Sequence, residues 1–228
     1  MATKKIAFYT LGDNRPVNGA RVIYDGKKRR LQMSQMWHLR AKSLAMAGMV
    51  HGVKTADAAE SAVRKIEQAA ALTNVYLVGH GFGQDGGGFF FSGKPAPPPS
   101  EFTATATDTL SLLSRVKMKK FAKTLAGVLS KTEAVQIAFL SCYTGRGKFS
   151  REFYSEVRAQ GIKKLTVGAY TDYYQTAYHT DGRGNINRWS DYVRDEHGTV
   201  VVKAGANGIP AFQERHPLVD PDDPLGGL

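Results

Sequence analysis

The chain has 228 residues, of which 42% are hydrophobic and 22% charged, as in globular proteins that bury a core. No apolar run reaches the length of a membrane span, so we expect none. The N-terminus lacks the apolar core of a secretory signal. We therefore expect a protein that stays in a cytoplasm or is exported by a signal-peptide-independent route into a host or neighbouring cell. A single cysteine excludes an intrachain disulfide and a zinc site of several thiolates, and the net charge of +11 favours anionic partners.

The hydrophobic pattern predicts that strands and helices alternate along the chain. Short apolar runs predict strands at 5–9, 75–78, 135–140 and 165–170. Apolar residues at three- and four-residue steps predict helices at 31–49, 57–72, 111–129 and 148–160. A helix that leads into a fully apolar strand is typical of parallel sheets. We therefore expect an α/β fold with an open, mostly parallel sheet and helices on both of its faces.

Turn residues and short β signals mark the remaining segments. A strand at 21–24 enters a tight turn and is followed by the basic run 27–30. Residues 94–108 are rich in Pro, Thr and Ala and predict an exposed loop at the rim of a cleft. Short strands and turns after Thr171, among them 199–203, predict a C-terminal β-flap or hairpin. We place one domain at 1–205 and a partly disordered tail at 206–228.

Two predicted strands end at reactive side chains. The strand 75–78 runs into Gly79-His80-Gly81, and the strand 135–140 runs into Ser141-Cys142. Ligands of open parallel sheets bind beyond the carboxyl ends of the strands, so neighbouring strands would bring His80 and Cys142 to one cleft. An imidazole and a thiol so placed make a base and a nucleophile. We expect the following helix to lower the pKa of Cys142, and the backbone N–H groups of Gly81 and Cys142 to hold an oxyanion.

Other chemical motifs in the chain are incomplete. The pattern G-x-G-x-x-G at 81–86 lacks a following helix, and the P-loop-like stretch 88–94 has Pro95 where Ser or Thr must bind magnesium. There is no G-x-S-x-G motif of a serine hydrolase. The histidines other than His80 show no metal-ligand spacing, so we expect no metal site.

The apolar strand ending in His-Gly, followed by a helix and an apolar strand ending in Ser-Cys-x-Thr-Gly, resembles the caspase-like (clan CD) cysteine peptidases. His80 and Cys142 lie 62 positions apart, which suits that group. Within it, the stretches 77–81, 91–93, 149–161 and 180–203 look most like the self-processing cysteine protease domains of bacterial toxins. Metacaspases have an acidic residue two positions before the cysteine that selects basic substrates, and here that position is Leu140.

The resemblance implies a cysteine endopeptidase that is self-processing or a secreted effector or toxin, with His80 and Cys142 as catalytic dyad and Gly81 at the oxyanion site. Such an enzyme needs no cofactor for the chemistry and acts on a protein or peptide. The toxin domains of this group are activated by inositol hexakisphosphate, which makes the same compound a candidate activator of this chain. Candidate residues for that polyanion are Lys27, Lys28, Arg29, Arg30, Arg183, Arg188, Arg194 and Lys203. A solvated basic face is the alternative for these residues.

Two other functions stay open. The charge of +11 also suits a non-catalytic binding module on the same fold, with an inositol phosphate or nucleic acid as ligand, although we regard nucleic acid as the less favoured partner. A Cys–His pair also serves transferases and deamidases. Labelling with a thiol-reactive peptide electrophile separates a peptidase from a binding module.

Overall fold

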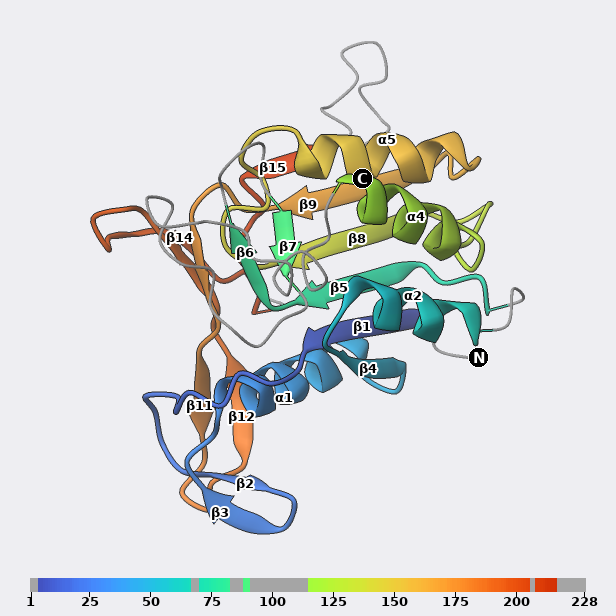
Figure 1. Cartoon of the computed structure of the whole chain (residues 1–228). Helices are drawn as coiled ribbons and strands as arrows, with labels where there is room; N and C mark the ends of the chain where they lie inside the picture. The colour runs from blue at the N-terminus through green and yellow to red at the C-terminus, as the bar shows by residue number, and fades with distance from the viewer. Residues whose placement is uncertain (1–3, 67–69, 83–87, 91–114, 206–207, 217–228) are drawn as a thin grey trace.

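A six-stranded sheet forms the centre of the protein, as Figure 1 shows. The computed structural model describes residues 4–66, 70–82, 88–90, 115–205 and 208–216. In spatial order the strands are β15 (Glu214–His216), β9 (Leu165–Ala169), β8 (Val135–Leu140), β5 (Asn74–Val78), β1 (Lys5–Thr10) and β4 (Met49–Val53). All neighbours pair in parallel except β15, which runs antiparallel to β9. The predicted open, mostly parallel α/β sheet is therefore confirmed.

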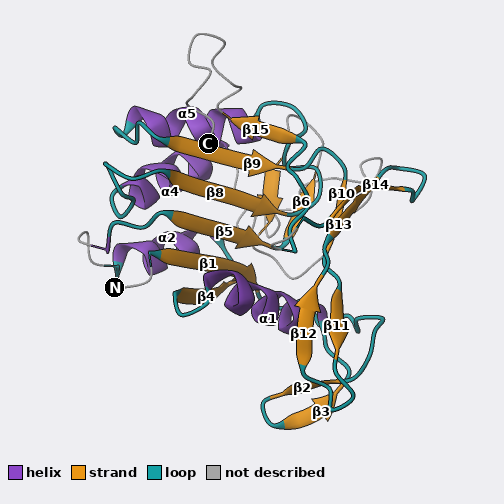
Figure 2. Cartoon of the chain, turned by 180° about the vertical axis from the view of Figure 1, so that it is seen from behind, coloured by secondary structure: helices purple, strands orange, loops and turns teal. Residues whose placement is uncertain are grey.

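Helices cover both faces of this sheet. The helices α2 (Ala56–Arg64), α4 (Arg115–Ala126) and α5 (Phe149–Ala159) lie on one face, and α1 (Met33–Ala45) lies on the other (Figure 2). Within the described part of the chain, no helix is long and apolar enough to cross a membrane.

The strands are buried on both sides because their side chains alternate between two cores. In β8, Ile137 and Phe139 pack with the core under α2, α4 and α5, whereas Ala138 and Leu140 pack with the core under α1. This explains why the central strands read as continuous apolar runs. The prediction for 135–140 matches the observed strand.

Small β elements surround the carboxyl ends of the central strands. Two hairpins are formed by β2 (Val22–Tyr24) with β3 (Lys27–Arg29) and by β11 (Tyr178–Thr180) with β12 (Ile186–Trp189). A three-stranded sheet consists of β10 (Tyr173–Gln175), β13 (Tyr192–Arg194) and β14 (Val200–Lys203), with β10 at its edge. The pair β6 (His80–Phe82) and β7 (Gly88–Phe90) follows β5.

Two predicted helices extend beyond the ends of the observed ones, and the first of them covers the start of a strand that was not predicted. The helix predicted at 31–49 ends at Ala45, and the chain then forms β4, which the sequence analysis did not predict. The helix predicted at 57–72 ends at Arg64, and Leu72 pairs with Leu129 instead. β4 is an edge strand with only partial burial, so its sequence lacks the apolar run of the central strands.

The C-terminal tail expected from residue 206 needs a correction. Residues 208–216 belong to the fold, because Ile209 is buried in the α1-side core and β15 pairs with β9. The buried Tyr170 donates a hydrogen bond to the carbonyl oxygen of Pro210 at 2.9 Å. The predicted loop at 94–108 and the residues after 216 lie outside the described residues.

Candidate active site

The two reactive segments leave adjacent strands at the same end of the sheet. β5 and β8 are parallel neighbours in which Val78 pairs with Leu140, the last residue of each strand. His80 and Cys142 are each two residues further on, and the Gly79 N–H bonds the Leu140 carbonyl at 3.3 Å. The predicted adjacency of the two strands is therefore correct.

The backbones of these segments touch at Gly81. A Cβ atom placed on Gly81 would lie 1.9 Å from the carbonyl oxygen of Cys142 and 3.0 Å from its carbonyl carbon. No side chain fits in that space, so the position requires glycine for a close approach and not for an unusual φ. The two residues expected at an oxyanion site are thus next to each other.

The imidazole of His80 is held by two side chains from other elements. Its Nε2 atom lies 3.0 Å from Oδ2 of Asp13, in the loop after β1. The Trp37 ring of α1 meets the imidazole at 86°, with 4.7 Å between ring centroids. A hydrogen bond and an edge-to-face ring contact together fix the orientation of a histidine.

Asp13 is a buried carboxylate and was not a predicted site residue. Burial acts to raise its pKa, but hydrogen bonds from His80 and Arg15 hold the pKa well below its usual value, so the group is ionised at neutral pH. Arg15 donates through Nη2 to Oδ2 at 2.7 Å. The loop is tied to α1, because Ser34 Oγ donates to the Asp13 carbonyl at 2.8 Å.

The charge of Asp13 selects one tautomer of His80. Arg15 Nη2 also lies 3.3 Å from His80 Nε2 and can only donate, so it favours an unprotonated Nε2. The shorter contact to an ionised carboxylate favours Nε2–H. We assign the proton to Nε2, which leaves Nδ1 as the atom that can accept a proton.

Burial favours the protonated form of Cys142. Its thiol donates to the Tyr174 carbonyl oxygen of β10, with 3.4 Å between Sγ and the oxygen. Part of the residue is exposed, but burial raises the pKa of the thiol to about 12. The expected lowering of this pKa by a helix is wrong, because α5 begins at Phe149 and a helix acts mainly on groups at its first turn.

The loop after Cys142 presents aromatic side chains. Tyr143 adopts a left-handed backbone with φ of 58°, and its N–H bonds the Asp172 carbonyl at 3.2 Å. Its ring meets that of Tyr173 at 86°, with 5.6 Å between centroids, and Tyr173 is 53% exposed. Arg146 lies over the Tyr143 ring and pairs with Asp172 at 3.2 Å. The surroundings of the thiol are therefore aromatic and balanced in charge.

The structure divides the predicted polyanion residues into two groups. The β2–β3 and β11–β12 hairpins lie together, because the Ile23 N–H bonds the Gly184 carbonyl at 2.8 Å and Tyr178 bonds the Ala20 carbonyl at 3.1 Å (Figure 1). We call these two hairpins, together with Arg30 directly after β3, the basic arm, and six predicted residues belong to it: Lys27, Lys28, Arg29, Arg30, Arg183 and Arg188. Arg194 and Lys203 lie in the separate sheet of β13 and β14.

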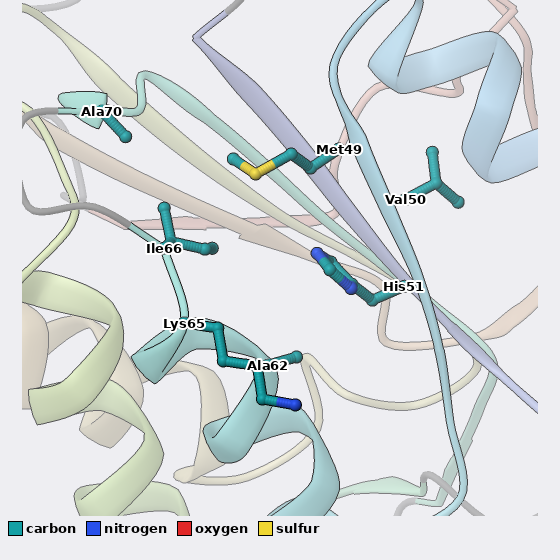
Figure 3. A pocket seen from close by; sticks show the side chains of 7 residues that line it. All are labelled: Met49, Val50, His51, Ala62, Lys65, Ile66 and Ala70. Atoms are coloured by element: carbon teal, nitrogen blue, oxygen red, sulfur yellow. The ribbon is translucent and has the colours of Figure 1, made fainter.

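A pocket lies away from these residues, beside the edge strand β4. It has a volume of about 560 Å³ and is lined by Met49, Val50, His51, Ala62, Lys65, Ile66 and Ala70 (Figure 3). The Nε2 atom of His51 is buried without a hydrogen-bond partner. Burial and the nearby Lys65 lower the pKa of His51, so its imidazole is neutral. None of the residues predicted for catalysis lines this pocket.

Among the described residues, no three His, Cys, Asp or Glu side chains gather as metal ligands.

Sequence reasoning missed Asp13 and Arg40. Asp13 follows the first strand at the carboxyl edge of the sheet, which could have marked it. Arg40 stands among the apolar residues Trp37, Ala41 and Leu44 of α1, and a charge on such a face indicates a buried partner.

A comparison of the chain with protein-family models finds no match, and a comparison with curated protein sequences finds none either. The likeness to caspase-like peptidases therefore rests on the two strand ends and on the order of the elements.

Proposed function

We propose that the protein is a cysteine endopeptidase in which Cys142 is the nucleophile and His80 the general base and acid. The proposal is supported above all by the contact of Gly81 with the Cys142 carbonyl, which brings the two strand ends together. The Asp13–His80 hydrogen bond supports it further, because an oriented base with an unprotonated Nδ1 suits proton transfer from a thiol.

In the proposed reaction, Sγ attacks the substrate carbonyl while its proton passes to His80 Nδ1. The tetrahedral oxyanion is stabilised by the backbone N–H groups of Gly81 and Cys142. His80 then protonates the leaving amine, and a thioester forms. Water hydrolyses the thioester with His80 as base, which restores the thiol. Asp13 keeps the imidazole in one tautomer and stabilises its cationic form.

The edge strand β10 offers a place for an extended substrate. It pairs only with β13 among the described strands, and its Tyr174 carbonyl contacts the thiol. An extended peptide that adds to such an edge gains main-chain hydrogen bonds, and pockets for its side chains give specificity. Tyr143 and Tyr173 are the residues next to Cys142 and Tyr174 in the chain, their rings contact each other, and they would contact residues next to the cleaved bond.

Covalent labelling tests this function. Cys142 is the sole cysteine, so a peptide electrophile that labels the protein at a thiol reports on this site alone. We expect rapid labelling that His80→Ala reduces strongly, whereas His197→Ala, at a side chain 80% exposed, has no effect. Equal labelling in all three proteins, no faster than that of a free thiol, would exclude the dyad.

Mass spectrometry of the purified protein, alone and with a protein mixture, identifies the products. Peptide cleavage, including self-cleavage of a self-processing effector, requires the addition of one water per bond. A modified substrate of unchanged length would instead indicate a transferase or a deamidase. Cys142→Ala, which removes only the sulfur, is the control that must abolish every product.

A polyanion site on the basic arm is a second candidate function, either as an activator site of the peptidase or without turnover. The structure favours it through the six basic side chains that the arm gathers from two distant segments. We expect inositol hexakisphosphate to bind, and Lys27→Glu with Lys28→Glu to weaken binding at least about tenfold. The matched pair Arg194→Glu with Lys203→Glu should have a smaller effect in calorimetry, and an equal effect contradicts a site on the arm.

A further inference from the structure

A buried ion pair joins helix α1 to the turn between β12 and β13. Arg40 and Asp191 have 1% and 0% of their side-chain surfaces exposed, and Arg40 Nη2 lies 2.7 Å from Asp191 Oδ2. Arg40 Nε also donates to Oδ2 at 2.9 Å, and its Nη2 donates to the Gly208 carbonyl at 2.9 Å. The guanidinium lies over the Trp189 ring at 5.2 Å. These contacts satisfy the buried charges.

The same carboxylate reaches the strand next to the nucleophile. The Tyr174 hydroxyl donates to Asp191 Oδ2, and the Ala177 N–H donates to Oδ1 at 3.3 Å. Both ends of the segment 174–177 are therefore attached to Asp191. The backbone carbonyl of Tyr174 is the group that accepts the hydrogen bond from Cys142 Sγ. One residue thus contacts the ion pair through its side chain and the thiol through its backbone.

We propose that Arg40 and Asp191 are positioning residues that set the place of β10 against Cys142, through the hydroxyl of Tyr174. The inference rests on the proposed function only for its effect on catalysis, since the position of the thiol can be measured without it. A buried ion pair is weak evidence for stability alone. A pair at the junction of α1, β10 and β13 does, however, specify one arrangement of those elements.

Tyr174→Phe tests the link because it removes only the hydroxyl that joins Asp191 to β10. Tyr170→Phe is the matched control. Tyr170 is also buried and stacks on Tyr174 with 4.9 Å between ring centroids, but its hydroxyl bonds the Pro210 carbonyl. Both changes keep the aromatic ring and remove one buried hydroxyl. They therefore differ in whether the hydroxyl reaches Asp191.

The main readout is the rate at which iodoacetamide alkylates Cys142 between pH 7 and 10. A thiol held by a fixed carbonyl reacts slowly, so we expect Tyr174→Phe to raise this rate about fivefold, the factor for loss of one hydrogen bond. Tyr170→Phe should leave the rate and its pH profile as in the wild type. Equal rates in all three proteins, or an equal increase in both variants, would overturn the proposal.

Arg40→Lys provides a second test, in case Tyr174→Phe does not fold. Lysine keeps the positive charge but lacks the planar fork that reaches Asp191 and Gly208 together. We expect the same rise in alkylation rate, and an unchanged rate in the folded variant would refute the positioning role. If the protein cleaves peptides, kcat should fall more than KM changes in both variants. An altered alkylation profile without any peptidase activity would support the positioning role and reject the proposed function.

Discussion

Replacing Gly81 by alanine tests the geometry on which the candidate site depends. The new methyl group would lie 1.9 Å from the Cys142 carbonyl oxygen, whereas real Cβ atoms essentially never approach other atoms closer than 3.0 Å. The two segments must then separate by about 1 Å. The obstacle is backbone and not the end of a flexible side chain, so the displacement moves the thiol or the imidazole.

The cost of this displacement follows from known overpacking effects. Extra methyl groups in packed interiors destabilise by about 1–3 kcal/mol, and a backbone clash belongs at the upper end of that range. For a chain of this size, about 3 kcal/mol lowers the Tm by roughly 6–12 °C. Thermal and urea unfolding measure this loss. Peptide-electrophile labelling should fall at least about tenfold in the folded variant, because small misplacements of reacting groups are costly.

Gly182→Ala is the control for the loss of a glycine. No atom lies within 4 Å of a Cβ placed on Gly182, and its backbone is outside the left-handed region. We expect this variant to match the wild type in Tm and labelling. A Gly81→Ala protein with wild-type Tm and labelling would show that the two segments are not in backbone contact and would refute the site.

Three further predictions concern the charges of the site and the core. Asp13→Asn should lower peptidase kcat at least about tenfold, because an amide does not hold Nε2–H as a carboxylate does. The folded state lowers the Asp13 pKa, so the stabilising effect of the carboxylate should be complete above about pH 5 and shrink below it, as urea titrations of both proteins would measure. The alkylation rate of wild-type Cys142 should rise from pH 7 to 10 without a plateau, because burial raises its pKa to about 12, and a plateau near pH 8 would contradict this protonation state. Arg40→Leu should destabilise by about 3–5 kcal/mol in urea unfolding because it leaves the buried Asp191 without its cation. Arg64→Leu should cost under about 1 kcal/mol, because the Arg64 side chain is 62% exposed and its partner Glu60 keeps an ion pair with Lys120.

The central strands could be predicted because local sequence determines them. β8 is apolar on both faces, and α5 carries Phe149, Phe153 and Val157 on one buried face. β4 could not be predicted in this way, because it is a half-exposed edge strand that contains His51 and Gly52. Its structure depends on pairing with β1, some forty residues away in the chain, which no local pattern reports.

The placement of His80 and Cys142 at one end of the sheet could be predicted from the two strand ends, but their surroundings could not. Asp13 lies in a cluster of turn residues, and its role depends on His80, 67 positions away. Arg40 and Asp191 are 151 positions apart. A single sequence indicates that a buried arginine needs a partner, but not which acid supplies it. The thiol pKa was predicted in the wrong direction because burial, which depends on the tertiary packing around the loop, outweighs the distant helix.

The protonated thiol determines how the proposed reaction can begin. With a thiol pKa near 12, a preformed thiolate–imidazolium pair is not the resting state, so proton transfer must accompany the attack of sulfur on the substrate. The Tyr174 carbonyl accepts a hydrogen bond from the thiol, whose proton passes to His80 in the proposed reaction. In the proposed binding mode, an extended substrate brings its own N–H groups to β10 and competes for that carbonyl. Substrate binding would then release the thiol toward Nδ1 of His80, so that the empty site is unreactive and the occupied site is ready for attack.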